Sequence, residues 1–325
     1  MENIEKCKYI SCCGAGLKGN CYIGIIEAFE MFFKSKRKIS WQEWTRTNIK
    51  GTCGSSAGAL MALCINLGLT SKTMKKIMHP IFMDARNLIP NPDIGVLISN
   101  YGLDKGAVIR NMITDALGAR GLNNDITFEC MYDLTRIDFC CTGTNLNSGT
   151  TVYFHKSTHP SMKVIDAIFI SASVPLLFAP MEYDNEIYVD GALTANLPIK
   201  YPISETLVLA VDQVDHHSIN KWMDFMGAIV GIGINAQKTL EQSILENVGC
   251  NITVNLYPEL RNKDSMDMDM DSRALSQLAT LGFYQVYKTL YPKLNEFATL
   301  MIMTLYSMRL MFIDDEHVRE LYSSK

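Results

Sequence analysis

The first chemically active feature of the chain is a serine placed between two glycines. In the run Gly54-Ser55-Ser56-Ala57-Gly58, a glycine stands two residues before and two residues after Ser56. A short apolar strand is predicted before this run and an apolar helix after it. This spacing is typical of a nucleophile elbow, a strained turn whose neighbouring glycines let backbone segments come close. We therefore predict that Ser56 is a nucleophile, with a non-catalytic helix start as the alternative; Ser55 lacks the flanking glycines.

A glycine-rich loop near the N-terminus is the second feature. The run Gly14-Ala15-Gly16-Leu17-Lys18-Gly19 lies between a predicted strand and a predicted helix, where amide hydrogens can bind a phosphate or an oxyanion. A dinucleotide-binding loop would need an acidic residue about 20 positions later, and the stretch Phe33–Trp41 offers only bases. A P-loop would need a Ser or Thr after its lysine. Because a serine nucleophile is predicted downstream, we favour an oxyanion-binding loop.

An aspartate far along the chain is the third feature. Asp190 ends an apolar predicted strand and is followed by Gly191. A carboxylate in that place can face the strand end that carries Ser56 and accept the serine proton. A plain Asp-Gly turn is the alternative and, on its own, the commoner one.

Taken together, these three elements resemble the patatin-like phospholipase family. The Gly-Ala-Gly-x-Lys-Gly loop, the Gly-x-Ser-x-Gly elbow and the Asp-Gly-Ala run occur in the order that the family has. Two further runs, Ser171-Ala172-Ser173-Val174-Pro175 before Asp190 and Asn196-Leu197-Pro198 after it, are also similar to the family. The chain departs from the family at Ala15, where a glycine is usual, while Lys18 keeps the positive charge.

The resemblance implies a lipid acyl hydrolase of the phospholipase A type. In this interpretation Ser56 and Asp190 form a Ser-Asp dyad, and the backbone amides of the Gly14–Gly19 loop form the oxyanion hole. The implied substrate is a phospholipid or another acyl ester at a membrane surface, and no metal or cofactor is implied. Neither an activating protein partner nor a head-group preference can be named from the sequence.

Two alternative functions stay open. His216 and His217 follow Ser56 and Asp190 in the chain order of a Ser-His-Asp esterase with the α/β-hydrolase mechanism. Their polar surroundings are more typical of a solvated loop, which favours the dyad. The second alternative is a catalytically silent scaffold that keeps the fold and binds a lipid or an anion at the glycine loop.

No residue pattern indicates a metal site. The acidic run Asp264–Asp271 alternates with methionines and has some of the spacing of a calcium loop. However, Ser272 replaces the turn glycine and Leu278 replaces the bidentate glutamate. The histidines and cysteines show no zinc spacing. We interpret the acidic run as a solvated loop.

The composition excludes several classes of protein. With 325 residues, 48% hydrophobic and 20% charged, the chain is globular, and a net charge of -4 gives no support for nucleic-acid binding. Its ten cysteines include pairs within apolar runs, which indicates free thiols in a reducing compartment. The N-terminus lacks a signal-peptide core, and no apolar stretch is long enough to span a bilayer. We expect an intracellular, cytoplasmic protein that could contact membranes peripherally.

Short β-rich runs alternate with helical ones along the chain, the pattern of a sheet covered by helices. Strands are predicted over Tyr9–Cys13, Asn48–Thr52, Asp138–Thr142, Thr151–His155, Glu186–Val189, Leu207–Val211 and Ile252–Leu256. Helices are predicted over Cys21–Phe33, Ala57–Leu67, Ser71–Met78, Lys105–Leu117, Met162–Ser171, Ala274–Thr289 and Leu294–Met311.

The fold expected from this order is α/β, with a central, mostly parallel sheet and helices on both faces. The resemblance makes it a three-layer patatin-like sandwich. We expect one domain over residues 1–325, with a core at about 8–212, a helical insertion at about 70–129 and a C-terminal helical segment at about 274–322. The apolar helix Leu294–Met311 belongs either to the core or to a lipid-contacting surface.

Overall fold

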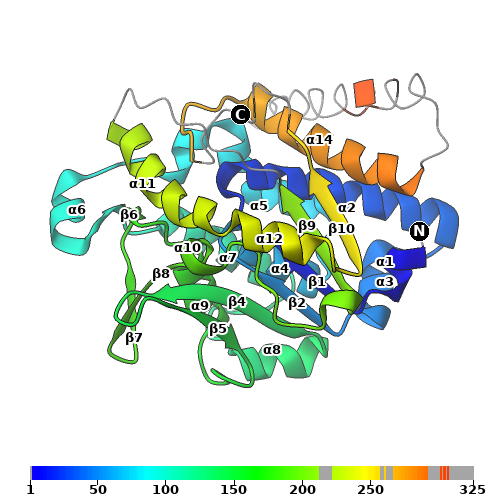
Figure 1. Ribbon diagram of the computed structural model, residues 1–325, viewed down its shortest axis with the longest axis horizontal. Coiled ribbons are helices and arrows are strands. Elements are labelled where there is room, and N and C mark those ends of the chain that lie inside the picture. Colours follow the sequence, from blue (N-terminus) through cyan, green and yellow to red (C-terminus); the bar gives the residue numbers. More distant parts are fainter. Residues whose placement is uncertain are drawn as a thin grey trace, which may run out of the picture.

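A central β-sheet organises the protein. The computed structural model describes residues 2–211, 222–256, 260, 266–291, 301, 303, 304 and 306. Its strands are β1 (Tyr9–Cys12), β2 (Gly51–Gly54), β3 (Gly102–Asp104), β4 (Asp138–Asn145), β5 (Thr150–His155), β6 (Leu176–Phe178), β7 (Met181–Tyr183), β8 (Glu186–Asp190), β9 (Thr206–Val211) and β10 (Cys250–Val254). Eight of them form one sheet in the order β10-β9-β1-β2-β4-β8-β7, with β5 also paired to β4 (Figure 1). β3 and β6 form a separate two-stranded sheet.

Most of the large sheet is parallel. β10, β9, β1, β2 and β4 pair with one another in parallel, whereas β5 and β8 are antiparallel to β4 and β7 is antiparallel to β8. Parallel strands need a crossover between them, and helices supply those crossovers here. The predicted α/β fold with a mostly parallel sheet is confirmed.

Helices fill the connections between the strands. They are α1 (Glu2–Lys6), η1 (Gly16–Asn20), α2 (Cys21–Phe32), η2 (Phe33–Arg37), α3 (Trp41–Asn48), α4 (Ala57–Asn66), α5 (Ser71–Met83), η3 (Ala85–Leu88), α6 (Ile94–Asn100), α7 (Ala107–Gly118), α8 (Phe128–Thr135), α9 (Val164–Ser171), α10 (Ala192–Ala195), η4 (Ile203–Glu205), α11 (Trp222–Ala236), α12 (Lys238–Leu245) and α14 (Ser272–Leu290).

Several helices begin where a polar side chain caps the first turn. The side-chain oxygens of Ser40, Thr70, Thr127 and Asp271 accept a hydrogen bond from the backbone N–H three residues later, at 2.8–3.3 Å. These bonds satisfy amide groups that have no partner inside the helix. The caps therefore fix the starts of α3, α5, α8 and α14.

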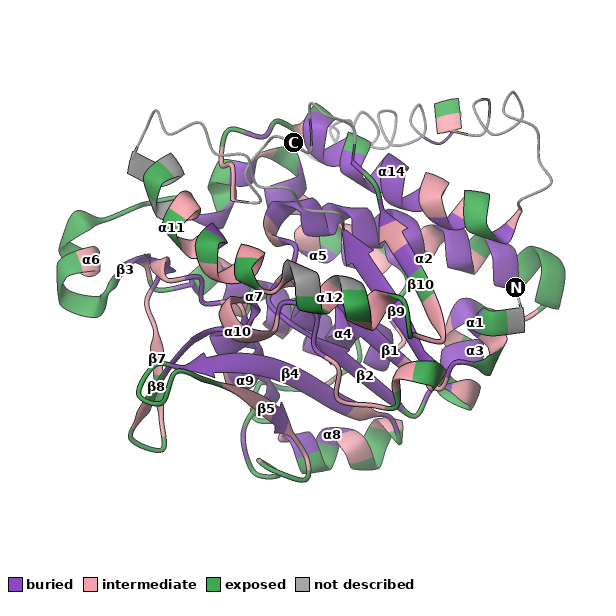
Figure 2. Cartoon of the chain, viewed as in Figure 1, coloured by how far each residue is buried: buried purple, intermediate pink, exposed green. Residues whose placement is uncertain are grey.

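The two faces of the sheet pack against different layers of helices. In β9, Leu207, Leu209 and Val211 belong to the large core, whereas Val208 and Ala210 belong to a smaller cluster on the other side. This alternation follows from the two-residue repeat of a strand. On the large-core side α2 packs along α14, and α4 and α9 pack on β4. In Figure 1 α10 and α12 lie on the near side of the sheet, and Figure 2 shows the strands buried between the layers.

The cysteines behave as buried free thiols. All ten are unpaired; eight are buried, Cys250 is intermediate and Cys130 is exposed. Burial raises the pKa of the Cys64 thiol to about 12 and that of Cys13 to about 11. Because the thiolate is the reactive form, Cys64 and Cys13 are unreactive at neutral pH. The expectation of free thiols is confirmed.

Several predicted elements are displaced in the structure or fall outside the described residues. The strand predicted over Asn48–Thr52 lies at Gly51–Gly54, because Asn48 ends α3, and the strand predicted over Ile252–Leu256 lies at Cys250–Val254. The helix predicted over Leu294–Met311 lies almost wholly outside the described residues. Within the described part of the chain, no helix combines the length and the apolar character needed to cross a bilayer.

Candidate active site

Ser56 lies in a strained turn between β2 and α4. Its φ of 53° and ψ of -128° are uncommon for any residue other than glycine. The backbone N–H of Ser56 donates to Oγ of Ser171 at 3.0 Å, and its carbonyl accepts from the N–H of Ala59 at 2.9 Å. These bonds hold the backbone in the strained conformation. Ser56 is 7% exposed, so its hydroxyl is presented to a largely dry environment.

The two elbow glycines are required by close packing. A Cβ atom on Gly54 would stand 2.1 Å from the carbonyl oxygen of Gly58. A Cβ atom on Gly58 would stand 2.4 Å from the carbonyl oxygens of Cys12 and Cys13. Both contacts are with backbone, which cannot move aside cheaply. The glycines therefore let the first turn of α4 sit directly against β2 and the end of β1, as the sequence predicts.

A difference in strand length brings Asp190 to Ser56. β2 ends at Gly54, which pairs with Cys141, while β4 continues four residues further to Asn145. β8 pairs antiparallel with only this extension and ends with Asp190 opposite Gly143. The ends of β2 and β8 consequently meet above Thr142. A Cβ atom on the next residue, Gly191, would be 2.3 Å from Oγ1 of Thr142, so only glycine lets the chain turn here.

The serine and the aspartate are in direct contact. Oγ of Ser56 donates to Oδ2 of Asp190 at 2.6 Å, and Oδ1 of Asp190 accepts from the N–H of Ala192 at 2.8 Å. Asp190 is 2% exposed. Burial raises the pKa of Asp190 from 3.8 to about 7, while the hydrogen bonds from Ser56 and Ala192 lower it. A carboxyl group with a pKa near neutrality can take a proton from a hydroxyl and return it.

The chain around Asp190 is fixed by partners that sequence patterns did not single out as site residues. The N–H of Asp190 donates to the carbonyl of Ser173 at 2.9 Å, and Oγ1 of Thr144 donates to the carbonyl of Asp190 at 2.8 Å. Nε2 of Gln237 donates to the carbonyl of Leu193 at 2.6 Å. Ser173 lies in a run that the family resemblance flags. Gln237, in the turn between α11 and α12, has no spacing signature, so only the structure reveals it.

The glycine loop lies beside the elbow. A Cβ atom on Gly14 would be 3.3 Å from Cβ of Ser56, and one on Gly19 would be 3.1 Å from Cβ of Ala57. Ala15 has a φ of -146° and a ψ of -1°, so this position does not need the left-handed conformation that favours glycine. Gly16 has a φ of +50°, and Lys18 is fully buried.

The amides of this loop have different roles. The N–H of Gly14 donates to the carbonyl of Asn196 at 2.9 Å, so it ties the loop to the segment after Asp190. The N–H groups of Ala15, Gly16 and Leu17 make no hydrogen bond to any described residue. They stand at the start of η1, where a turn leaves its first donors without internal partners. Such donors can stabilise an anionic oxygen next to Ser56.

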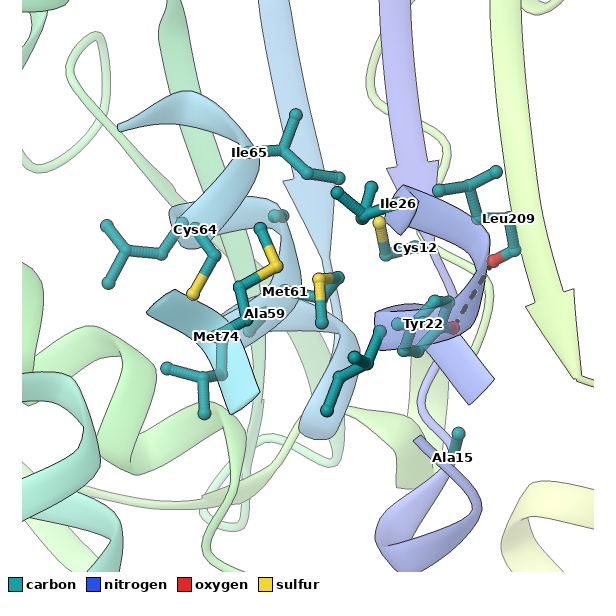
Figure 3. Close-up of a cluster of buried hydrophobic side chains, with 14 of the residues drawn as sticks. Cys12, Ala15, Tyr22, Ile26, Ala59, Met61, Cys64, Ile65, Met74 and Leu209 are labelled. Carbon is teal, nitrogen blue, oxygen red and sulfur yellow. Dashed lines mark hydrogen bonds between the residues drawn. The ribbon is translucent and has the colours of Figure 1, made fainter. Parts of the chain in front are cut away.

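An apolar pocket opens at Ser56. It has a volume of about 80 Å³ and is lined by Gly16, Leu17 and Ser56 together with aliphatic and aromatic side chains of α4, α5, α7, α9 and β6. Its methionines are Met61, Met74, Met78, Met112 and Met266. Figure 3 shows Met61, Cys64 and Met74 gathered beside α4. Because thioether side chains adapt their shape, this wall suits a flexible apolar ligand.

The histidine pair and the acidic run are the other possible site residues that the sequence offers. His216 and His217 lie outside the described residues. Of the acidic run, Asp271 caps α14 by accepting from the N–H of Ala274 at 2.8 Å, and Asp267 accepts from the N–H of Asp269 at 3.0 Å. Among the described residues, no group of three or more His, Cys, Asp or Glu side chains is placed to hold a metal ion.

Comparisons with known proteins show which proteins this chain is similar to. The chain is 21% identical over 305 residues to protein R571 of Acanthamoeba polyphaga mimivirus, which covers 89% of this chain and 95% of the relative. It is 25% identical over 153 residues to the probable lipid hydrolase 463L of Invertebrate iridescent virus 6, covering 46% of this chain and 52% of that protein.

A likeness in fold extends to a solved structure. The crystal structure of VipD from Legionella pneumophila matches 98% of this chain and 77% of its own, with a TM-score of 0.54 at 14% identity. The model of the patatin-like phospholipase family matches residues 10–203, a range that includes the glycine loop, the Ser56 elbow and Asp190. With more than half of its length matched, the chain belongs to the patatin-like phospholipase family.

Proposed function

We propose that this protein is a lipid acyl hydrolase that cleaves fatty-acyl esters of phospholipids by means of a Ser56–Asp190 dyad. Membership of the patatin-like family and the likeness to a probable lipid hydrolase support lipid hydrolysis. The observation that carries the dyad is the 2.6 Å hydrogen bond from Oγ of Ser56 to Oδ2 of Asp190. It joins the nucleophile directly to a carboxylate, with no imidazole between them.

In the first half of the reaction Asp190 accepts the proton of Ser56 as Oγ attacks the ester carbonyl. The carbonyl oxygen becomes an anion, and in this proposal it accepts hydrogen bonds from the amides of Ala15, Gly16 and Leu17, two of which line the pocket with Ser56. Each such donor contributes on the order of 3 kcal/mol to transition-state stabilisation. Asp190 then returns the proton to the leaving alcohol, which departs as a lysophospholipid and leaves an acyl-serine.

The second half releases the fatty acid. Asp190 accepts a proton from water, the hydroxide attacks the acyl-serine, and the same proton returns to Ser56 as the fatty acid leaves. The pKa of about 7 supports this double use, because a base must hold the proton briefly and release it easily. The methionine-lined pocket supports an acyl chain as the group bound next to Ser56.

The experiment compares fatty-acid release from phosphatidylcholine vesicles by the wild type, Ser56→Ala and Asp190→Asn. We expect both variants to lose at least about 1,000-fold in kcat while remaining folded by circular dichroism, and the double variant to be little worse than either. The nucleophilicity of Ser56 is checked by mass spectrometry of the phosphonyl-serine adduct that forms with an active-site-directed phosphonate. Wild-type turnover in folded Ser56→Ala would overturn the assignment.

The scaffold alternative has a clear signature in the same assay. A catalytically silent protein would bind vesicles without releasing fatty acid, and no phosphonate adduct would form on Ser56. The strained elbow favours the enzyme, because backbone strain of about 1–3 kcal/mol is retained where it presents a reactive group.

A further inference from the structure

Helix α6 carries an apolar stripe that nothing in the described chain covers. None of its residues is buried, and Ile94, Ile98 and Tyr101 at its end are 70%, 77% and 68% exposed. Ile94 and Ile98 are four residues apart, so they lie on one side of the helix, and Tyr101, with a left-handed φ of 62°, directly follows its last residue. Figure 1 shows α6 projecting from one end of the molecule, and Figure 2 shows its exposed surface.

The projection is held in place at its base. The chain leaves the body at Asp84, which forms a β-bridge with Asp271, and the N–H of Ala85 donates to the carbonyl of Met270 at 3.4 Å. It returns through β3, which pairs in parallel with β6. The N–H of Asp93 donates to the carbonyl of Leu103 at 3.0 Å and closes the excursion. The stripe is therefore presented on an anchored support.

The base of the projection is also the wall of the apolar pocket. Leu88, six residues before α6, lines the pocket, as does Phe178 of β6, the partner of β3. Ile81 of α5 and Ile109 of α7, on the chain before and after the excursion, line it too. The exposed stripe and the pocket that contains Ser56 thus belong to one continuous segment of structure.

The chemistry of the stripe fits a lipid surface. Ile94–Asn100 contains no charged residue, and the nearby acid, Asp93, caps α6 by accepting from the N–H of Gly95 at 2.6 Å. An uncharged face of branched aliphatic side chains ending in a tyrosine gains free energy on entering the boundary between head groups and acyl chains. A polar protein partner would find few groups here to hydrogen-bond.

We propose that the α6 stripe inserts into the lipid surface and brings the pocket that contains Ser56 to the membrane. This inference rests on the proposed function, since it gives that site its route to aggregated lipid. It assigns membrane binding to Ile94, Ile98 and Tyr101, which are separate in the chain from Ser56 and Asp190.

The test separates binding from hydrolysis. Sedimentation with phosphatidylcholine vesicles is measured in the Ser56→Ala background, so that binding does not depend on turnover. We expect Ile94→Asp/Ile98→Asp to lower the vesicle partition coefficient by about 10-fold or more. The matched control, Leu134→Asp/Leu146→Asp, changes two comparably exposed residues, 65% and 53%, outside α6 and should bind as the parent does.

Activity forms the second arm, with Ser56 intact. The α6 variant should lose vesicle hydrolysis by a similar factor and keep its rate on a short-chain monomeric ester. Since α6 buries no residue, the unfolding temperature of the α6 variant should stay close to that of the wild type. If the aspartates alter folding, Ile94→Ser/Ile98→Ser replaces the aspartate variant in both arms. Unchanged vesicle binding by a folded α6 variant, or equal loss in the control, would overturn the proposal. Absence of hydrolysis on both substrates, with the binding difference intact, would instead reject only the proposed function.

Discussion

Replacing Asp190 with asparagine should remove activity and yet stabilise the protein at alkaline pH. The substitution keeps the size of the side chain. The amide oxygen of an asparagine can still accept from the N–H of Ala192, and its NH₂ group can donate to Oγ of Ser56. What disappears is a charge buried in a dry site, together with the only group in the dyad able to accept the serine proton.

The magnitude follows from the pKa. Burial raises the pKa of Asp190 from 3.8 to about 7, so the folded protein holds this proton more tightly than the unfolded chain does. Well below pH 3.8 both states are protonated and the group has no effect on stability. As the pH rises through the window from 3.8 to about 7, the unfolded chain ionises first and the folded state loses stability. Since one pKa unit equals about 1.4 kcal/mol, the full penalty above pH 7 is about 4 kcal/mol.

The assay is urea unfolding followed by tryptophan fluorescence at pH 8 and at pH 4.5, which reports on the buried side chains of Trp41 and Trp44. At pH 8 Asp190→Asn should unfold with a free energy higher than that of the wild type by up to about 4 kcal/mol. At pH 4.5 the difference should shrink to below about 1 kcal/mol. In parallel, wild-type kcat should fall as the pH drops through about 7, because a protonated Asp190 accepts no proton.

Two results would refute this reasoning. An Asp190→Asn protein that is no more stable than the wild type at pH 8 would mean that the carboxylate is not destabilised by burial. A wild-type rate that stays constant from pH 8 to pH 5 would mean that the base with the raised pKa does not act in turnover.

Four further predictions test other parts of the site. Gly58→Ala should lower the free energy of unfolding by at least about 3 kcal/mol, because its Cβ would meet backbone oxygens at 2.4 Å. Gly118→Ala, whose Cβ would have nothing within 4 Å, should raise the free energy of unfolding by up to about 1 kcal/mol. Equal melting temperatures of the two variants would contradict this prediction. Ser171→Ala removes the acceptor of the Ser56 amide and should lower kcat about 10-fold or more with KM unchanged, and a change in KM alone would argue against a positioning role. His216→Ala/His217→Ala should stay within a few-fold of the wild type if the dyad is correct, while a loss of several orders of magnitude in folded protein would establish a triad. Turnover should be unaffected by EDTA, and activity that returns only with added calcium would point back to the acidic run that includes Asp267.

The parts of the site that sequence could predict are those fixed by local sterics. The glycines around Ser56 are read directly from the chain because a tight strand-to-helix turn forbids a Cβ at those two positions. The start of α3 carries an equally local signal, because the side chain of Ser40 accepts a hydrogen bond from the N–H of Glu43, whereas the end of α3 at Asn48 has no such signal.

Other parts depend on distant segments and leave no local pattern. The contact of Asp190 with Ser56 requires β4 to extend four residues beyond the end of β2, and strand lengths of this kind cannot be read from the hydrophobic pattern. Ser171 lies in a run that resembles the family, but its hydrogen bond to the Ser56 amide cannot be read from that run, and the amide of Gln237 has no sequence signal at all. The three-residue strands β3, β6 and β7 are too short for any alternation to show.

The meeting of β2 and β8 above Thr142 also bears on how the protein folds. The hydrogen bond between Ser56 and Asp190 joins residues 134 positions apart, and in the folded protein it depends on the pairing of both β2 and β8 with β4. Contacts between distant residues pay a loop-closure entropy before they gain interaction energy, and proteins rich in them fold slowly. In a refolding experiment we expect tryptophan fluorescence from the early N-terminal layer to recover before ester hydrolysis does. The recovery of enzymatic activity would then report on a late step of folding, the pairing of β8 with the free end of β4.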